Sequence, residues 1–357
     1  MTLPSPTQPM PVLRRRQLMA GLGATALAGA WPFAPAWAQR GKFGNAECGI
    51  ASIDPLYAMV YVGAKNGYFA DAGLNLKPMN AQSGPRAKQM LAAGQIFAAV
   101  SGVNDAVSLT LAGKQAVLVG GFDTRIPFAN ILISKKLYDS GVRDIQGLAG
   151  RSIGITQPQS ATWLMAVYLS DRAGIKDKVQ IRPLGDFATM LGAVKSGSVD
   201  CCTATYSMLN KAQAEGWGVP LFDVTDTAKW NTAFGGDIPG VGIYVMKDSI
   251  DKRPEAVQAL VTGLSRATDY LHKTSAEEVV ALIGAEYLQG YERQLSIDAV
   301  TNFKKVWSPD NLIGPQHYER LMAVMGDGRQ MSAEDAARVP YANMVDMRFV
   351  KAARGLA

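Results

Sequence analysis

The sequence predicts an α/β protein with two similar units in series, each a mostly parallel sheet flanked by helices, followed by a helical C-terminal part. Three observations support this prediction. The 357 residues exceed the usual size of one domain. Short apolar runs alternate with helical patterns, and this alternation starts again after Gly150. Beyond Pro254 the pattern is helical throughout.

The first unit alternates strands and helices from residue 48 onward. Ser83 and Gly94 flank one of its helical patterns as start and stop signals. A sheet built from such β-α-β steps is mostly parallel and is covered by helices. The expected strands are 48–53, 74–79, 97–100 and 116–120. The expected helices are 55–66, 85–93 and 104–112.

The second unit repeats this order. Its first helix starts at Ser160 or Thr162 and ends before Gly174, which again stops the helix. The expected strands are 152–156, 179–182, 199–205 and 220–223. The other expected helices are 186–196 and 207–214. The repeated order predicts a second lobe of the same kind as the first.

Two extended passages that contain Gly and Pro flank the second unit in the sequence. Residues 120–133 lie before it and residues 232–244 lie after it. A chain that leaves one lobe, builds another and returns needs two such crossings. The helical part follows, and Ser275 with Glu278 forms a capping box at one of its helix starts. Its expected helices are 254–273, 275–287, 296–306 and 315–325.

The N-terminal segment 1–38 predicts a secretory signal that is removed before Gln39. Arg14, Arg15 and Arg16 are its only charged residues, an uncharged run follows, and Ala36-Trp37-Ala38 supplies the small-residue cleavage motif. The uncharged run is too short to span a bilayer. In the segment 1–38, Arg15 and Arg16 are followed by Gln, Leu and Met, and this order resembles the twin-arginine export signal. We therefore expect a soluble periplasmic protein.

The net charge of +6 does not indicate a nucleic-acid-binding protein. Half of it comes from the three arginines of the signal, so the remaining chain carries +3. The ordinary apolar content and the 18% of charged residues argue against disorder. Three cysteines exclude a disulfide-rich scaffold.

The sequence predicts no catalytic residue, metal site or cofactor. It lacks the nucleophile elbow, the zinc-protease motif and the phosphate-binding loop, and it contains only two histidines. Cys201-Cys202 is the unusual feature. Adjacent cysteines can form a disulfide or carry redox or metal chemistry. Alternatively, they point to opposite faces of a buried strand.

Small polar residues gather at four strand-to-helix turns. In an open parallel sheet these turns meet at the carboxyl ends of the strands, where ligands bind. Their N–H groups and hydroxyls suit a small anion. Each hydroxyl residue could instead simply cap its helix. The turns are 83–84, 101–104, 159–162 and 203–206.

An ordered set of short motifs resembles the nitrate/sulfonate/taurine group of ABC-transporter solute-binding proteins, which includes a branch similar to thiamine-pyrimidine-precursor proteins. Phe97 departs from the group's pattern, which has an acid there. The motifs are Ile-Asp-Pro-Leu-Tyr at 53–57, Ala-Lys-Asn-Gly-Tyr-Phe at 64–69, Ala-Gly-Leu-Asn-Leu at 72–76, Leu-Ala-Ala-Gly-Gln-Ile-Phe-Ala at 91–98, Leu-Ala-Gly-Arg-Ser-Ile-Gly-Ile at 148–155 and Lys-Ser-Gly-Ser-Val-Asp at 195–200.

The resemblance implies a two-lobed periplasmic-binding-protein type II fold with a ligand in the cleft. It places the first lobe at 43–125, the second at 126–235, and the return to the first lobe with the C-terminal helices at 236–357. By position it implies these ligand-binding residues: Asp54, Leu56, Tyr57, Ser83, Gly84, Ser101, Gly102, Gln159, Ser160, Thr162, Thr203, Thr205 and Tyr206. Phe128, Trp163 and Trp230 would be cleft walls or, alternatively, core residues.

The function expected from this resemblance is solute capture for an ABC importer by hinge closure. The expected protein is a monomer, and its expected partner is an inner-membrane permease. A small organic anion such as a sulfonate is the expected ligand, and Arg86 and Arg125 are its possible charge partners. A neutral aromatic or pyrimidine-type ligand is the alternative. Two further possibilities are an enzyme like the thiamine-pyrimidine synthases and a sensing module without a permease.

Overall fold

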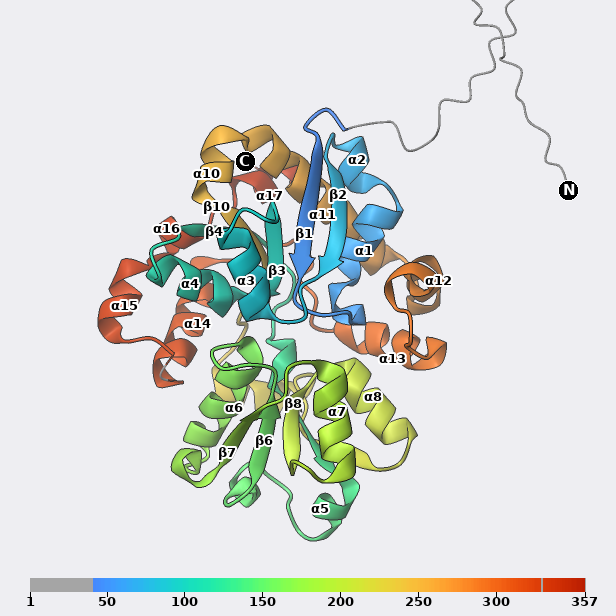
Figure 1. Ribbon diagram of the computed structural model, residues 1–357, viewed down its shortest axis with the longest axis vertical. Helices are drawn as coiled ribbons and strands as arrows, with labels where there is room; N and C mark the ends of the chain where they lie inside the picture. The colour runs from blue at the N-terminus through green and yellow to red at the C-terminus, as the bar shows by residue number, and fades with distance from the viewer. Residues whose placement is uncertain (1–40, 329, 357) are drawn as a thin grey trace, which may run out of the picture. The chain divides into compact units, whose positions relative to one another are not determined.

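The computed structural model describes residues 41–328 and 330–356. They form two lobes, each with a five-stranded mixed sheet flanked by helices (Figure 1). The predicted signal and its cleavage position lie outside the described residues. Within the described part of the chain, no helix is long and apolar enough to cross a membrane.

The sheet of the first lobe has the strand order β2-β1-β3-β10-β4. Four of its strands come from the start of the chain, and β1 pairs in parallel with both β2 and β3. The strand β10 is inserted antiparallel between β3 and β4. The strand bounds are β1 (Asn45–Ile50), β2 (Asn75–Asn80), β3 (Ala98–Gly102), β4 (Ala116–Gly121) and β10 (Val241–Met246).

The sheet of the second lobe has the same design, in the order β7-β6-β8-β5-β9. Here β6 pairs in parallel with β7 and β8, and β5 is the antiparallel strand between β8 and β9. The strand bounds are β5 (Asn130–Ser134), β6 (Ser152–Ile155), β7 (Gln180–Pro183), β8 (Cys201–Ala204) and β9 (Gly218–Phe222).

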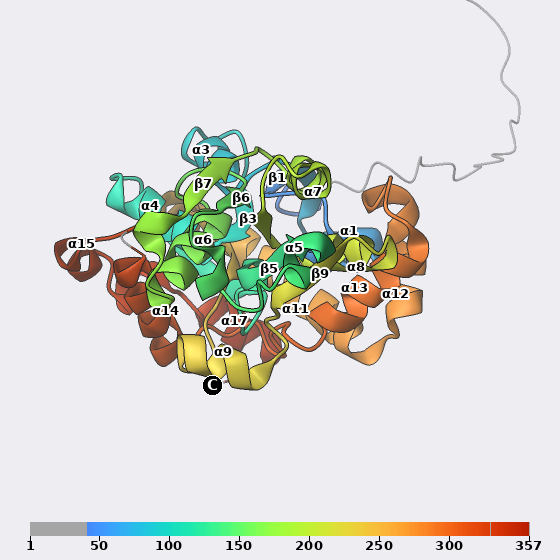
Figure 2. The same cartoon turned by 90° about the horizontal axis from the view of Figure 1, so that it is seen from below.

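The helices cover both faces of each sheet. In the second lobe α6 lies on one face and α7 and α8 lie on the other (Figure 2). In the first lobe α3 and α4 pack together over β3, while α1 packs on α11. The bounds are η1 (Pro55–Tyr57), α1 (Ala58–Lys65), α2 (Tyr68–Asp71), α3 (Gly84–Ala92), α4 (Val103–Leu111), α5 (Lys135–Asp139), α6 (Ala161–Arg172), α7 (Phe187–Ser196), α8 (Tyr206–Ala214) and α9 (Thr227–Phe234).

The C-terminal part is helical, as the sequence predicts. The helix over 254–273 has the predicted bounds, and the predicted capping box of Ser275 and Glu278 is present. The helix α13 begins at Arg293, three residues before the predicted start. The bounds are α10 (Lys247–Lys252), α11 (Pro254–Lys273), α12 (Ala276–Tyr287), α13 (Arg293–Phe303), α14 (Pro315–Asp327), α15 (Ala333–Arg338), α16 (Tyr341–Met344) and α17 (Arg348–Arg354).

The first strand was predicted three residues too late. It spans Asn45–Ile50, with Asn45 and Glu47 exposed and Ala46 and Cys48 buried. This alternation is typical of a strand with one face in solvent. A search for continuous apolar runs does not find the start of such a strand, because polar residues interrupt the run. Residues 51–53, expected in the strand, instead form the loop that leads from the sheet toward the second lobe.

The two passages expected as plain crossings each contain the antiparallel strand of a sheet. The first leads into β5 and the second into β10. The parallel strands of each lobe run toward the other lobe, so a chain that arrives from the other lobe must enter the sheet in the opposite direction. Their Gly and Pro residues made these segments look irregular in the sequence.

Asp123 joins the two crossings. Its carboxylate accepts hydrogen bonds from the backbone N–H groups of Gly240 at 2.6 Å and Val241 at 3.0 Å. Backbone bonds run beside it from Phe122 N to Val241 O and from Ile238 N to Thr124 O. The buried carboxylate therefore satisfies two N–H groups that the adjoining strand ladder does not reach.

We expect Asp123→Ala to lower the free energy of unfolding by about 2 kcal/mol or more, because it leaves two buried N–H groups without an acceptor. Urea unfolding followed by circular dichroism measures this loss. Asp251→Ala is the control, since Asp251 is an exposed partner of Lys247 and its loss should change stability by less than about 0.5 kcal/mol. Equal stability of the two variants would contradict the role given to Asp123.

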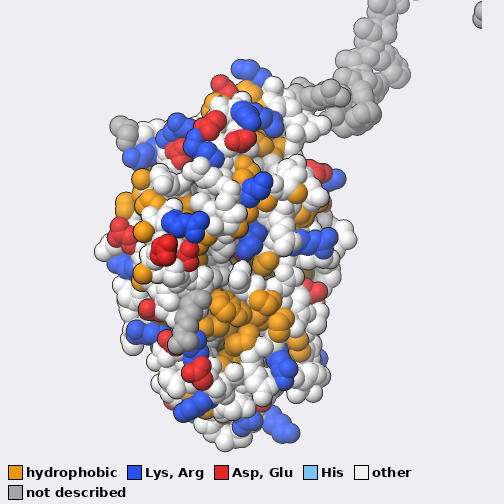
Figure 3. Space-filling view, turned by 60° about the vertical axis from the view of Figure 1, so that its left-hand side comes forward, with side chains coloured by type: hydrophobic (Ala, Val, Ile, Leu, Met, Phe, Trp, Pro, Cys, Tyr) orange, Lys and Arg blue, Asp and Glu red, His pale blue; other side chains and the backbone are white. Residues whose placement is uncertain are grey.

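Charged side chains of both signs are interspersed on the face shown in Figure 3, with an apolar area between them. The described ion pairs are mostly exposed, such as Lys252 with Asp248 and Lys135 with Asp139. Pairs of this kind contribute little to stability. The stability of the protein therefore rests mainly on the buried apolar side chains of both lobes.

Candidate ligand-binding site between the lobes

A small cavity of about 20 Å³ lies where the strand-to-helix turns of the two lobes meet. This volume holds about one water molecule, so the lobes are closed onto each other. A larger solute can enter only if the lobes move apart. The cavity is lined by Ala51, Tyr57, Ser83, Gly84, Gly102, Asp105, Phe128, Thr156, Ser160, Ala161, Thr162 and Phe187.

The first lobe contributes two close backbone approaches. Ser83 caps α3 by accepting a hydrogen bond from Arg86 N at 3.3 Å, so the N-terminus of this helix faces the cavity. A Cβ atom at Gly84 would lie 2.1 Å from Oδ2 of Asp105. A Cβ atom at Gly102 would lie 2.9 Å from the Cβ of Ala161 in the other lobe. At both positions glycine is needed because a side chain would collide with a neighbouring residue, and not because the backbone adopts a conformation that only glycine favours.

The second lobe contributes a cluster of three hydroxyls. The Oγ1 of Thr156 lies 2.8 Å from Thr162 Oγ1 and 3.1 Å from Ser160 Oγ. Ser160 also caps α6 by accepting from Trp163 N at 3.1 Å. Because these hydroxyls already bond to one another and to backbone groups, they form a rigid polar wall.

Aromatic rings complete the lining. Phe128 and Phe187 lie with ring centroids 6.0 Å apart. Tyr57 is fully buried, and its hydroxyl makes no hydrogen bond with any described residue. A buried hydroxyl without a partner costs free energy unless a ligand or water satisfies it. Tyr57 can therefore serve as a hydrogen-bonding group toward a solute.

Asp105 is the charged residue of the lining. Its side chain is 1% exposed, and neither carboxylate oxygen accepts a hydrogen bond of good geometry from a described residue. The Nζ of Lys88 approaches Oδ1 to 3.6 Å and is not part of the cavity lining. Burial raises the pKa of Asp105 to about 6, against the attraction of Lys88, so the carboxylate is ionised at neutral pH.

Asp54 connects the lobes beside the cavity. Its Oδ1 accepts from Leu56 N at 2.8 Å within the first lobe. Its Oδ2 accepts from the hydroxyls of Thr205, at 2.9 Å, and of Ser207 in the second lobe. Burial raises the pKa of Asp54 to about 6, and the three hydrogen bonds oppose this rise. We call Asp54, Thr205 and Ser207 the interlobe latch.

The structure brings seven of the residues predicted as ligand-binding or wall residues around the cavity, and nine lie outside its lining. Their contact with a ligand stays a prediction. The seven are Tyr57, Ser83, Gly84, Gly102, Phe128, Ser160 and Thr162. The nine are Asp54, Leu56, Ser101, Gln159, Trp163, Thr203, Thr205, Tyr206 and Trp230.

Most of those nine have structural partners. Ser101 lies on the other face of β3 from Gly102, because strand side chains alternate, and its hydroxyl bonds to Tyr244 at 2.7 Å. The hydroxyl of Tyr206 donates to Asp223 Oδ1 at 2.8 Å. Trp230 is buried in the second lobe, where its indole donates to Gly236 O at 2.8 Å. These three side chains are buried and have partners within the protein, and their contact with a ligand stays a prediction.

The remaining six differ in their surroundings. The carbonyl of Gln159 accepts from Asn104 at 3.1 Å across the cleft. Thr203 is buried with an unpartnered hydroxyl, and Trp163 is half-buried against the core. Leu56 is a core residue, and Asp54 and Thr205 belong to the latch.

Sequence reasoning missed Ala51, Asp105, Thr156 and Phe187 in the lining, whereas Ala161 lies in the predicted turn 159–162. Asp105 had a usable signal, since it is the acidic residue in the first turn of a helix that follows a predicted cleft turn. The anion partners considered for the ligand lie elsewhere. Arg86 donates to Gln82, and Arg125 donates to Val224 O at 2.8 Å. No Lys or Arg stands among the described residues that line the cavity.

The cysteines are free and buried in the described chain. Cys201 and Cys202 are adjacent in β8, where Cys201 Sγ lies 3.5 Å from Ser152 O. Burial raises the pKa of both thiols, and that of Cys48 to about 12. Protonated, inaccessible thiols are poor nucleophiles and poor metal ligands. This supports the interpretation of the pair as strand core residues.

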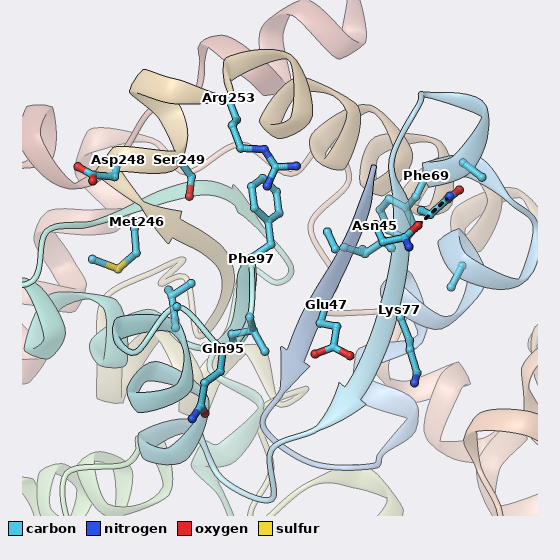
Figure 4. A pocket seen from close by; sticks show the side chains of 18 residues that line it. Asn45, Glu47, Phe69, Lys77, Gln95, Phe97, Met246, Asp248, Ser249 and Arg253 are labelled. Carbon is cyan, nitrogen blue, oxygen red and sulfur yellow. Dashed lines mark hydrogen bonds between the residues drawn. The ribbon is translucent and has the colours of Figure 1, made fainter. Parts of the chain in front are cut away.

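A larger hollow, about 940 Å³, lies at the opposite end of the first sheet (Figure 4). It is open, belongs to one lobe only and adjoins the start of β1. The guanidinium of Arg253 lies 4.9 Å from the ring centroid of Phe97 there. Ligands of open α/β sheets bind at the carboxyl ends of parallel strands. The cavity between the lobes therefore remains the stronger candidate site.

Comparison with known proteins identifies the family. A family model described as NMT1/THI5 like matches residues 54–278, which is more than half of the chain. The chain belongs to the NMT1/THI5-like family. No curated protein matches this NMT1/THI5-like chain at a significant level.

The fold of this family member is similar to that of several proteins with solved structures. A protein from Bordetella bronchiseptica RB50 has a TM-score of 0.78 at 22% identity, covering 87% of this chain and 97% of the other. The alkanesulfonate-binding protein SsuA from Xanthomonas axonopodis pv. citri, bound to MOPS, has a TM-score of 0.68 at 15% identity, covering 85% and 98%. The periplasmic nitrate-binding protein NrtA from Synechocystis PCC 6803 has a TM-score of 0.68 at 12% identity, covering 87% and 88%.

These likenesses confirm the predicted two-lobed periplasmic-binding-protein type II fold and the resemblance to the nitrate and sulfonate group. The desulfurization enzyme DSZB shares the fold as well, with a TM-score of 0.58 at 14% identity. The fold alone therefore does not separate binding proteins from enzymes, and the chemistry of the site must do so.

Proposed function

We propose that this NMT1/THI5-like protein is the periplasmic solute-binding component of an ABC importer. The observation that carries the proposal is the cavity between the lobes, where turns of both lobes surround the hydroxyl of Tyr57 and the carboxylate of Asp105, neither of which has a hydrogen bond of good geometry with a described residue. A site divided between two lobes exists only when they are together, so binding and closure are coupled. The boundaries proposed for the lobes are 43–125 with 236–357 for the first and 126–235 for the second.

In this mechanism an open form admits a small solute, and the lobes close over it by bending at the two crossings. The latch from Asp54 to Thr205 and Ser207 forms only in the closed form. The closed protein then presents both lobes to an inner-membrane permease. Export by the N-terminal signal, by the twin-arginine route, places the protein in the periplasm. No covalent step is required.

A thermal-shift panel on the purified protein tests this function. Sulfonates, carboxylates, nitrate, amines and heteroaromatic compounds are added in turn, and a true ligand raises the unfolding midpoint with its concentration. Small-angle X-ray scattering with the same compound should show a smaller radius of gyration than without it. Failure of every compound to stabilise the protein would remove the small-solute proposal. A permease gene beside this one would favour import over a sensing role.

The enzyme alternative depends on Cys201 and Cys202, because a thiamine-pyrimidine synthase-like reaction would need reactive groups. We expect Cys201→Ser with Cys202→Ser to leave solute affinity within about threefold of wild type, since both thiols are buried and none lines the cavity. Isothermal titration calorimetry measures this, with unfolding curves as the check on folding. A loss of binding without a loss of stability would support a chemical role for the pair.

A further inference from the structure

The cavity contains a buried carboxylate, Asp105, whose oxygens make no hydrogen bond of good geometry with a described residue, although Lys88, Ser101 and the Gly102 backbone lie close to it. Asp105 lies in the first turn of α4, where the helix dipole favours a carboxylate. The N-terminus of this helix is thus already occupied by the protein's own anion. Lys88 forms an ion pair with Oδ1 at 3.6 Å from outside the lining, a distance too long for a hydrogen bond, so the carboxylate can still accept one from a solute.

The Asp105 carboxylate can lie where it does only because residue 84 has no side chain. An ideal Cβ at residue 84 would lie 2.1 Å from Asp105 Oδ2 and 3.0 Å from its Cγ. The carboxylate therefore occupies the space of the missing side chain, between the N-termini of α3 and α4. The backbone at Gly84 has no left-handed conformation that would itself require glycine. Space for Asp105 is thus the physical reason for glycine here.

We propose that Asp105 selects the solute, and that the cavity takes a compound with a protonated nitrogen, such as an amine or an amidine, in preference to anions. This inference rests on the proposed binding function. An ionised carboxylate without hydrogen bonds is satisfied by an N–H donor and repels a second anion in the same small space. Tyr57 adds a neutral polar contact, and Phe128 and Phe187 flank the solute.

The test compares probes of equal shape and opposite charge. Acetamidinium is matched with acetate, and guanidinium at low millimolar concentration is matched with nitrate. Methylammonium and methanesulfonate extend the two sets. Thermal shift and calorimetry are run on wild type, Asp105→Asn, Gly84→Ala and Lys88→Met. Native mass spectrometry of the freshly purified protein identifies any copurifying compound.

We expect the nitrogen donors to raise the midpoint of wild type and the matched anions to leave it unchanged. Asp105→Asn should weaken donor binding at least about 30-fold. Gly84→Ala should weaken it too, because it displaces the carboxylate without changing the charge. Lys88→Met should retain binding. Asp105→Asn also removes the ion pair with Lys88, so its ligand-free midpoint is measured as well. A purely structural role would weaken nitrogen donors and anions alike, whereas a selective role weakens the donors only.

Binding of the anions alone would overturn the inference and leave the proposed function standing. Unchanged donor affinity in Asp105→Asn would also overturn it. If no probe of either charge binds and no compound copurifies, the inference fails together with the proposed function.

Discussion

Replacing Gly102 with valine is expected to hold the lobes apart and to weaken solute binding by roughly a hundredfold while both lobes remain folded. Gly102 ends β3 and faces the first residue of α6 across the cavity. An added Cβ would meet the Oδ1 atom of Asn104 in the same lobe, a side-chain end that can turn aside, and would lie 2.9 Å from the Cβ of Ala161 in the other lobe, closer than real side-chain carbons pack. Relief of such overpacking costs about 3 kcal/mol, and the lobes can provide it by separating.

Scattering and calorimetry check this expectation together. The variant should keep the larger radius of gyration of the open form even with a compound that closes wild type. Gly192→Val is the matched control, because Gly192 lies in α7 with no atom within 4 Å of an added Cβ. The interpretation of Gly102 as a contact residue is wrong if its variant closes and binds like the control.

Asp54→Ala is expected to open the interlobe latch and to reduce solute affinity by roughly 30-fold or more. The substitution removes the acceptor of two hydroxyls that reach it from the second lobe, Thr205 at 2.9 Å and Ser207. Hydrogen bonds to a charged group contribute about 1.5 to 3 kcal/mol each. Both hydrogen bonds cross the cleft, so their loss raises the free energy of the closed form and changes that of the open form little.

The hydroxyl partners provide the control for this prediction. Asp54 also caps η1 through Leu56 N at 2.8 Å, so its variant changes the first lobe as well. Thr205→Val with Ser207→Ala removes the latch from the second lobe and keeps the cap. The triple variant should bind no more weakly than Asp54→Ala, because the three residues act as one unit. Additive losses in affinity would show that these residues act independently of a latch.

Sequence periodicity was sufficient for most of the fold because it records which face of each element is buried. The long helix over 254–273 is amphipathic and bounded by Pro254, and its predicted ends agree with the structure. β5 and β10 were not predicted as strands, since nothing in a short apolar segment says which sheet it will join or in which direction. The predicted start of β1 was three residues too late because the exposed Asn45 and Glu47 interrupt the apolar run at the beginning of the strand.

The candidate site was predictable to the level of turns and not of individual side chains. Ser83, Ser160 and Gly102 were placed near the cavity because turns after parallel strands meet at one edge. Ser101 was placed there too, although its neighbour Gly102 takes the cavity face and Ser101 bonds to Tyr244. The pairing of Asp105 with Gly84 could not be predicted, because it joins two helices whose separation only packing determines.

The sequence by itself determined that this protein has two α/β units, two crossings and a helical end, and it predicted export. These features depend on local patterns, such as burial periodicity, caps and a signal with its arginines. Only the tertiary structure decided which polar groups meet in the cleft. There the buried carboxylate of Asp105 matters more than the net charge of the chain, because water screens the exposed charges and screens a buried one much less.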